Sequence, residues 1–180
     1  EVTDLAFYEF EGKVPKIGKD SFVHPEAVII GEVEIGENCY IGATAVLRAD
    51  SGKIKIGDGT NIQDGAIIHA DPDTVAFIGK NNLVGHGAML HGPLVMGEDV
   101  MVGINSTILM GCEIGDGCII AAGSVVKNNT KLAPKRMVAG VPASEVREVS
   151  DNVVMYTKIG VQIYQELASR SLKGMKKVDI

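Results

Sequence analysis

An aliphatic residue returns about every sixth position along most of this 180-residue chain, and this period is the strongest constraint on its fold. Clear members of the repeat are Ile29, Ile35, Ile41, Leu47, Ile108, Ile114, Ile120 and Val126. Six residues are too few for a helix with its turns, but they accommodate a short strand followed by a tight turn. The repeat therefore predicts an all-β solenoid in which three short strands make one coil.

Five stretches that each begin with isoleucine or methionine followed by glycine mark successive coils, and we call each of them the anchor of its coil. The anchors begin at Ile35, Ile56, Ile78, Met96 and Ile114, which gives spacings of 21, 22, 18 and 18 residues. Three hexapeptides make a unit of 18 residues, so the first two spacings contain inserts of three and four residues, at "SGK" and "ADPD". This organisation resembles that of the hexapeptide-repeat proteins, and the resemblance implies a left-handed parallel β-helix.

The chain divides into two parts at the end of the repeat. Residues 1–144 are expected to form the β-helix, with about the first ten residues covering its open end. In residues 145–180 the apolar residues recur mostly at steps of three and four, which predicts an amphipathic helix packed along the prism. Gly160 weakens the helical pattern slightly.

Composition excludes several classes of protein. The formal net charge is −6 and there is no run of Lys or Arg, so nucleic acid is not an expected partner. The chain shows neither a signal-peptide pattern nor about 18 consecutive apolar residues, so we expect no membrane association and a cytoplasmic location. Cys39, Cys112 and Cys118 lack CxxC spacing and predict buried, reduced thiols.

We name the faces of the prism A, B and C in chain order and compare the residue after each repeated aliphatic. On face B this residue is glycine in all five coils. On face A it is never glycine, and the six residues there are Ile30, Arg48, His69, His91, Leu109 and Lys127. His69 and His91 are therefore predicted to lie on adjacent coils, about 4.8 Å apart at the strand spacing, where two imidazoles can share a metal ion.

The stretch "GHGAMLHG", residues 85–92, places a third histidine on the neighbouring face. His86 lies on face C, beside Gln63 and Asp64 of the adjacent coil, and should diverge from His69 and His91 of its own chain. It would join the pair of another subunit if face C of one chain packed on face A of the next, which closes a cyclic trimer. The alternative is that the histidines are solvated or form only hydrogen bonds.

Three neutral imidazoles with an open fourth position form the ligand set of a catalytic zinc ion, which lowers the pKa of bound water. Imidazole also suits Fe²⁺ and Co²⁺, so the native metal is left open among the three.

Three stretches, "RAD" at 48–50, "IGDGTNIQDGAIIH" at 56–69 and "GHGAMLHG", resemble the γ-class carbonic anhydrase family, including its relatives from carnitine and phenylacetate operons. The match covers about residues 10 to 150, and the ending "YQELASRSLKGM" looks most like the operon-encoded relatives. The resemblance implies a homotrimer that hydrates CO2 to bicarbonate. Its metal would be held at each interface by His69 and His91 of one chain and His86 of the next.

The resemblance also assigns roles to residues around the metal. Arg48 and Asp50 match an ion pair that orders bicarbonate, and a purely structural interface pair is the alternative. The polar set Asn61, Gln63 and Asp64 matches residues that orient the hydroxide and CO2, and turn chemistry is the alternative. Tyr164 matches a tyrosine that reaches the pocket in some relatives, and helix packing is the alternative.

Two departures from the family pattern concern proton transfer. Ser51 stands where the best-studied members carry a glutamate, and the short "ADPDTVAF" replaces an acidic loop that contains another. Because a positioned acid or base contributes about 10² to 10⁴-fold, slow proton transfer is expected. Metal binding is thus a firmer expectation than anhydrase activity.

Three other functions stay open beside CO2 hydration. Many hexapeptide-repeat proteins transfer acyl groups from coenzyme A, and "AGVPASEVR" resembles their shared coil ending, although His24 is the only histidine outside the predicted metal set. A metal-dependent thioester hydrolase would use the same activated water. A non-catalytic metal-binding scaffold is the third alternative.

Overall fold

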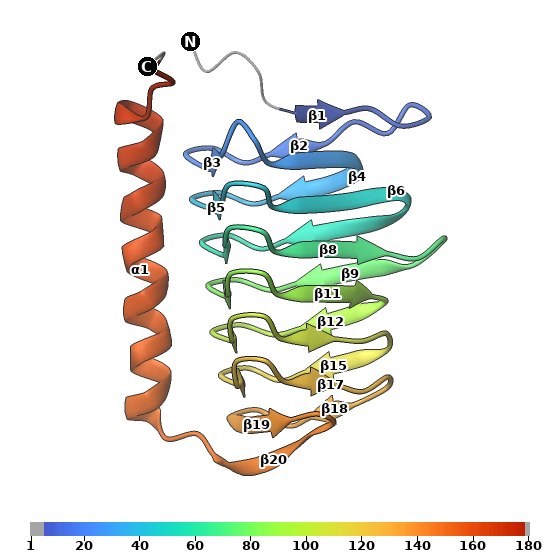
Figure 1. Ribbon diagram of the computed structural model, residues 1–180, viewed down its shortest axis with the longest axis vertical. Coiled ribbons are helices and arrows are strands. Elements are labelled where there is room, and N and C mark those ends of the chain that lie inside the picture. The colour runs from blue at the N-terminus through green and yellow to red at the C-terminus, as the bar shows by residue number, and fades with distance from the viewer. Residues whose placement is uncertain (1–5, 179–180) are drawn as a thin grey trace.

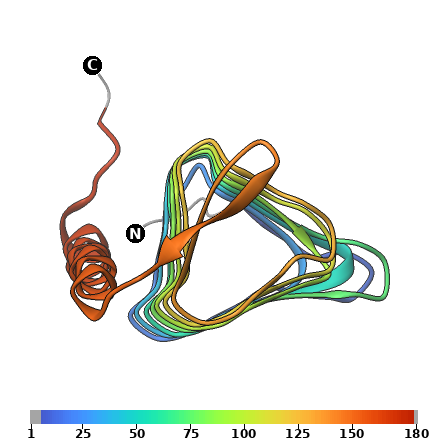
Figure 2. The same cartoon turned by 90° about the horizontal axis from the view of Figure 1, so that it is seen from below.

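The computed structural model describes residues 6–178 and is a left-handed parallel β-solenoid with one long helix beside it (Figure 1). Seen along its axis, the solenoid is a triangular prism (Figure 2). The predicted fold class is therefore confirmed, and the hexapeptide period maps onto three faces.

Faces A and B form one continuous 12-stranded sheet, because two long strands bend from one face into the other. These strands are β4 (Val28–Ile35) and β6 (Val46–Ile56). The remaining strands of face A are β1 (Ala6–Tyr8), β8 (Ile67–Ala70), β11 (Met89–Gly92), β14 (Thr107–Ile108) and β17 (Val125–Val126). Those of face B are β2 (Lys16–Ile17), β9 (Val75–Ile78), β12 (Leu94–Met96), β15 (Cys112–Ile114) and β18 (Lys131–Leu132).

Face C is a separate eight-stranded sheet. Its strands are β3 (Phe22–Val23), β5 (Tyr40–Ile41), β7 (Asn61–Ile62), β10 (Leu83–Val84), β13 (Met101–Val102), β16 (Ile119–Ile120), β19 (Arg136–Gly140) and β20 (Ala143–Glu148). All of these pair in parallel except β20, which runs antiparallel to β19 and closes the last coil.

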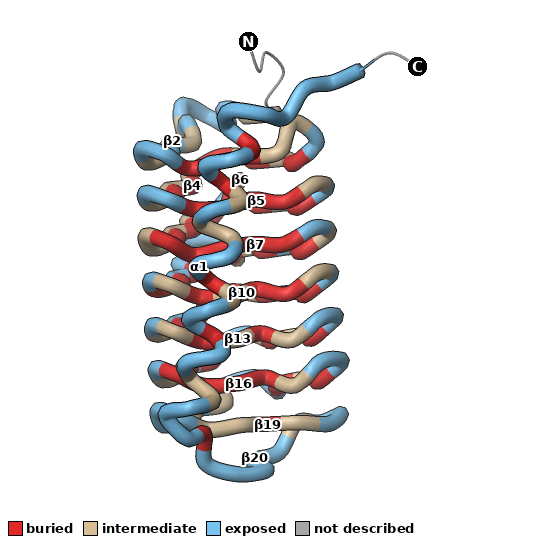
Figure 3. The backbone as a smooth tube through the Cα atoms, turned by 90° about the vertical axis from the view of Figure 1, so that its left-hand side faces the viewer, coloured by how far each residue is buried: buried red, intermediate tan, exposed pale blue. Residues whose placement is uncertain are grey.

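The repeated aliphatic residues are buried and form a single core cluster. Figure 3 shows that buried positions recur in every coil of the solenoid. On face A the column Ile29, Leu47, Ile68, Leu90 and Ile108 is fully buried. Each inward residue stacks on its equivalent in the next coil, because the parallel strands pair in register. The residue after each aliphatic on face A consequently points outward.

The glycines of face B have a steric cause. An added Cβ at Gly57 would lie 2.6 Å from the carbonyl carbon of Gly79 in the next coil. At Gly115 an added Cβ would lie 2.5 Å from the backbone nitrogen of Pro134. Here the chain turns a corner while coils remain at the strand spacing, so backbone occupies the space of a side chain.

Replacing Gly57 with alanine is therefore expected to lower the free energy of unfolding by about 1–3 kcal/mol, the usual cost of overpacking. Gly174→Ala is the matched control, because its Cβ would meet nothing within 4 Å. Thermal unfolding of both variants measures the difference. Equal stability of the two would show that the corner can relax.

All three cysteines are free and buried, as the sequence predicts. Burial raises the pKa of the Cys39 thiol to about 11, and it also raises the pKa of Cys112 and of Cys118. Since the thiolate is the reactive form, Ellman's reagent at pH 8 should modify these thiols slowly in the folded protein and rapidly after denaturation. Fast modification of the native protein would contradict the packing described.

The helix α1 (Asp151–Gly174) begins later than the predicted boundary at 145, because residues 143–148 form β20. It packs on β3, β5, β7 and β10 and thus covers part of face C. Gly160 has a packing role, since an added Cβ would lie 2.9 Å from Cδ1 of Leu83. In residues 6–178, no helix carries an apolar stretch long enough to cross a membrane.

The buried side of α1 differs in part from the expected apolar stripe. Its fully packed positions are Thr157, Val161, Ala168 and Ser171, whereas Tyr156, Ile159 and Ile163 are exposed. Tyr164 and Leu167 do belong to the contact, because they are partly buried against Phe22 and Tyr40.

At the opposite end, β1 pairs with β4, in agreement with an N-terminal cap. The rest of the predicted cap, residues 1–5, lies outside the described residues.

Candidate metal centre

Three polar side chains form a column on the outer surface of face A. Arg48, His69 and His91 occupy the same register position in β6, β8 and β11. The two imidazole rings are perpendicular to each other, with their centroids 5.3 Å apart. The prediction that these histidines stack on adjacent coils is thus met by the backbone register.

Backbone carbonyls orient both imidazoles. The Nδ1 atom of His69 lies 2.9 Å from the carbonyl oxygen of Arg48, and that of His91 lies 3.1 Å from the carbonyl oxygen of Gly92. A carbonyl only accepts hydrogen bonds, so each neutral ring carries its proton on Nδ1. Each Nε2 atom then presents its lone pair as a possible metal ligand, and at His69 an ion would take the place of Nη2 of Arg48, which lies 3.4 Å from that nitrogen.

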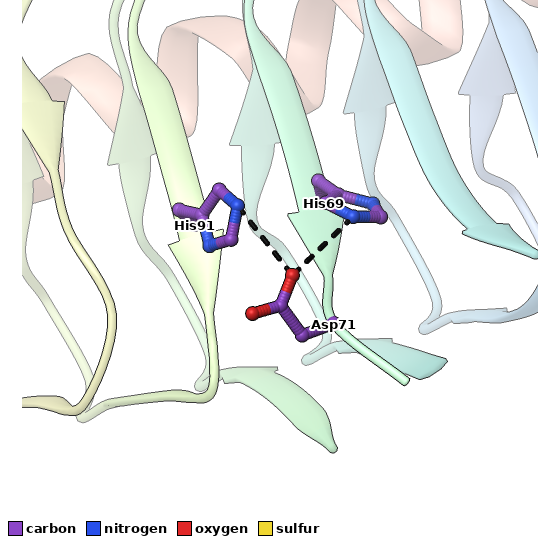
Figure 4. A group of neighbouring side chains, drawn as sticks. All are labelled: His69, Asp71 and His91. Carbon is purple, nitrogen blue, oxygen red and sulfur yellow. Dashed lines mark ion pairs between the residues drawn. The ribbon is translucent and has the colours of Figure 1, made fainter. Parts of the chain in front are cut away.

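Asp71 completes a cluster of three possible ligands (Figure 4). Its Oδ1 atom lies 3.7 Å from Nε2 of His69 and 3.6 Å from Nε2 of His91. Sequence reasoning missed Asp71 because "ADPD" was treated as an insert between coils. A signal was present, since Asp71 follows His69 by two residues and side chains at that spacing share one side of a strand.

Arg48 joins this cluster to Asp50. Its Nη1 atom donates to Oδ2 of Asp50 at 2.6 Å, and its Nη2 atom lies 3.4 Å from Nε2 of His69. Burial would raise the pKa of Asp50, but the hydrogen bond and charge of Arg48 outweigh it and leave that pKa below its usual value. A cation is thereby held beside the imidazoles, where it can attract an anion.

The other predicted site residues gather around His86. The Nδ1 atom of His86 lies 3.3 Å from Oδ2 of Asp64, and its Nε2 atom lies 3.5 Å from the hydroxyl of Tyr164 on α1. Gln63 is buried and donates to Oδ1 of Asn61 at 3.1 Å. Tyr164 also packs against Tyr40, with ring centroids 5.2 Å apart, so helix packing accounts for part of its placement.

Within one chain, the cluster around His69 and His91 and the group around His86 lie on different faces of the prism. Arg48, Asp50, His69 and His91 project from the 12-stranded sheet, while Asn61, Gln63 and His86 belong to the strands and corners of face C. The face A cluster is partly exposed in the single chain: the side chains of Arg48, His91 and His69 are 45%, 27% and 14% exposed. Cavities of about 340 and 520 Å³ lie elsewhere, beside Glu32 and at the C-terminal end of α1.

Comparison with known proteins agrees with the coil pattern. The family described as bacterial transferase hexapeptide (six repeats) matches residues 15–49 and 93–128. The stretch between the two matches contains both inserts and most of the candidate site. The regular coils therefore carry the family pattern, and the candidate centre lies where the repeat is modified.

The chain is 43% identical over 166 residues to the carnitine operon protein CaiE of Escherichia coli K12, covering 92% of this chain and 84% of that protein. It is 40% identical over 173 residues to CaiE of Salmonella agona, covering 96% and 87% of the two chains.

Two solved structures are also similar to this chain over nearly its whole length. A Bacillus cereus protein described as a candidate acetyltransferase superposes with a TM-score of 0.89 at 32% identity, covering 93% of this chain and 98% of that one. A hexapeptide transferase family protein from Anaplasma phagocytophilum superposes with a TM-score of 0.85 at 32% identity, covering 91% and 96%. By its repeats, its fold and its similarity to CaiE, the chain belongs to the hexapeptide-repeat family.

Proposed function

We propose that this protein is a metal-dependent enzyme that hydrates CO2 reversibly to bicarbonate. One observation carries the proposal: His69 and His91 stand on adjacent coils with both Nδ1 atoms bonded to backbone carbonyls, so that the two Nε2 atoms are the possible metal ligands. A bound ion would replace the contact between Nε2 of His69 and Nη2 of Arg48. Zinc suits this donor set, and Fe²⁺ or Co²⁺ are alternatives. The bound ion would supply a water molecule acidic enough to act as a nucleophile near neutral pH.

The second part of the proposal is a homotrimer in which face C of one chain meets face A of the next. Within one chain, His86 stands with Asp64 and Tyr164, apart from His69 and His91. A neighbouring chain would bring its own His86 to the pair and would also cover a centre that is partly exposed in the single chain. Repetition of this contact about a threefold axis gives three equivalent sites.

In this trimer, the side chains around the metal ion would have different roles in catalysis. Arg48, held by Asp50, would bind the anionic product and keep it beside the metal. Asp64, whose Oδ2 atom lies 3.3 Å from Nδ1 of His86, would orient that imidazole electrostatically. Gln63 and Asn61 form a buried hydrogen-bonded pair that could position the nucleophile and CO2 from the neighbouring chain.

Acyl transfer from coenzyme A is the second candidate, and the comparisons in themselves favour it over CO2 hydration. The matching family is named for transferases, and the Bacillus cereus relative is described as a candidate acetyltransferase. His24 has its Nδ1 atom 3.1 Å from the backbone nitrogen of Glu26 and lies in the first coil, so His86 with Asp64 is the more suitable general base. Metal-dependent thioester hydrolysis shares features of both functions.

Stopped-flow CO2 hydration, measured before and after removal of metal with a chelator, tests the proposal. We expect activity that is lost on chelation and returns with added Zn²⁺. Release of free coenzyme A from acetyl-coenzyme A is measured in parallel, with and without an amine or hydroxyl acceptor. Metal-independent release that requires an acceptor, without CO2 hydration, would replace the proposal with acyl transfer. Absence of both activities in a metal-loaded protein would favour the non-catalytic scaffold.

A further inference from the structure

The distances around Asp71 are close to those of a metal site. Tetrahedral coordination with bonds of about 2.0–2.1 Å places neighbouring ligand atoms about 3.3–3.5 Å apart. Oδ1 of Asp71 lies 3.6 and 3.7 Å from the two Nε2 atoms, and the three ligand atoms all lie within 4.8 Å of one another. Both separations from Asp71 are therefore close to those of a tetrahedral site.

Packing between the two inserts holds Asp71 in this place. The carbonyl oxygen of Asp71 accepts hydrogen bonds from the backbone nitrogen and the hydroxyl of Thr74, at 3.1 and 2.8 Å. The backbone nitrogen of Asp73 donates to Ser51 at 3.2 Å, and an added Cβ at Gly52 would lie 2.5 Å from the carbonyl oxygen of Asp71. The "SGK" insert thus supports the turn that begins at Asp71.

Charge also favours a ligand role for Asp71. Two neutral imidazoles leave both charges of a divalent ion uncompensated, and the guanidinium of Arg48 adds a further positive charge nearby. Asp50 is already paired with Arg48, whereas Oδ1 of Asp71 faces both Nε2 atoms. Two histidines and one carboxylate are a common protein ligand set for divalent metals.

We propose that Asp71 is a third metal ligand from the same chain, so that a single chain holds a divalent ion with His69, Asp71 and His91. The inference rests on the metal centre of the proposed function and goes beyond it: His86 of a neighbouring chain is then dispensable for metal binding, although not for catalysis. Metal uptake by a chain would not have to wait for assembly. In the trimer His86 would replace Asp71 at the ion, because a tetrahedral centre with four protein ligands has no open position for water.

Zn²⁺ titration by calorimetry, on metal-stripped protein, separates the two ideas. The proteins are the wild type, His86→Ala, and His86→Ala combined with either Asp71→Asn or Asp73→Asn. We expect His86→Ala to bind about one Zn²⁺ per chain. Adding Asp71→Asn should weaken that binding by ~10-fold or more, the scale of losses at metal sites. Asp73→Asn, an exposed acid in the same turn, should leave it unchanged.

Each outcome has one meaning. If the wild type takes up no Zn²⁺, the metal centre and the proposed function both fail. If the wild type binds Zn²⁺ and His86→Ala does not, the single-chain site is wrong while the shared site stands. Equal affinities for the Asp71→Asn and Asp73→Asn proteins would also overturn the inference. Thermal unfolding of every variant, read by circular dichroism, establishes that differences in binding do not come from unfolding.

Discussion

Replacing His91 with alanine is expected to remove the bound metal and to reduce CO2 hydration to background. His91 supplies one of the two Nε2 atoms that face Oδ1 of Asp71, and its loss leaves one imidazole and one carboxylate on face A. Loss of a partner that merely orients a ligand costs about 10–100-fold in metal affinity, so loss of the ligand itself should cost at least as much. Elemental analysis of the purified variant measures the metal directly.

His24→Ala is the control for this experiment. His24 belongs to the first coil, and its Nδ1 atom lies 3.1 Å from the backbone nitrogen of Glu26, outside the candidate centre. This variant should keep both metal and activity. A His91→Ala protein that still carries about one metal ion per chain would show that face A is not the metal centre.

Arg48→Ala should separate catalysis from metal binding. A guanidinium is too basic to ligate a cation, and Arg48 is held 2.6 Å from Asp50, where it would bind the anionic product. We expect the rate of CO2 hydration to fall by about 10²-fold, the usual effect of removing one donor to a developing anion, with metal content unchanged. Stopped-flow assays and elemental analysis on one preparation measure both quantities.

Lys127→Ala is the matched control, because Lys127 occupies the equivalent position four coils further along face A and is exposed. It should leave both rate and metal content unchanged. Combined loss of metal and oligomeric state in Arg48→Ala would instead identify the Arg48–Asp50 pair as a structural contact between subunits.

The coil architecture was predictable because each hexapeptide carries the same short pattern of a strand followed by a tight turn. Glycine at Gly57 and at Gly115 marks corners where the next coil's backbone fills the space of a Cβ. On face A the corresponding positions carry side chains, among them His69 and His91, because there the chain continues as a strand and these side chains point outward. Their registration could therefore be counted from the sequence.

Features that depend on packing between distant segments cannot be predicted from the hexapeptide period. Asp71 reaches the imidazoles because two inserts, twenty residues apart, pack against each other. The helix begins after the predicted boundary at 145 because the pairing of β20 with β19 closes the solenoid and does not follow the hexapeptide period. The contact between subunits involves two chains, so its geometry lies beyond what one chain's periodicity specifies.

Random reassembly of two inactive variants is the most direct test of the shared centre. His86→Ala and His91→Ala are unfolded together in equal amounts and refolded, and native mass measurement shows that mixed trimers form. An interface is intact when face A comes from a His86→Ala chain and face C from a His91→Ala chain, which occurs at about one interface in four in a cyclic trimer. Activity is predicted to return to about a quarter of that of wild type treated in the same way. Activity that stayed at the level of the separate variants, with mixed trimers present, would contradict a centre shared between chains.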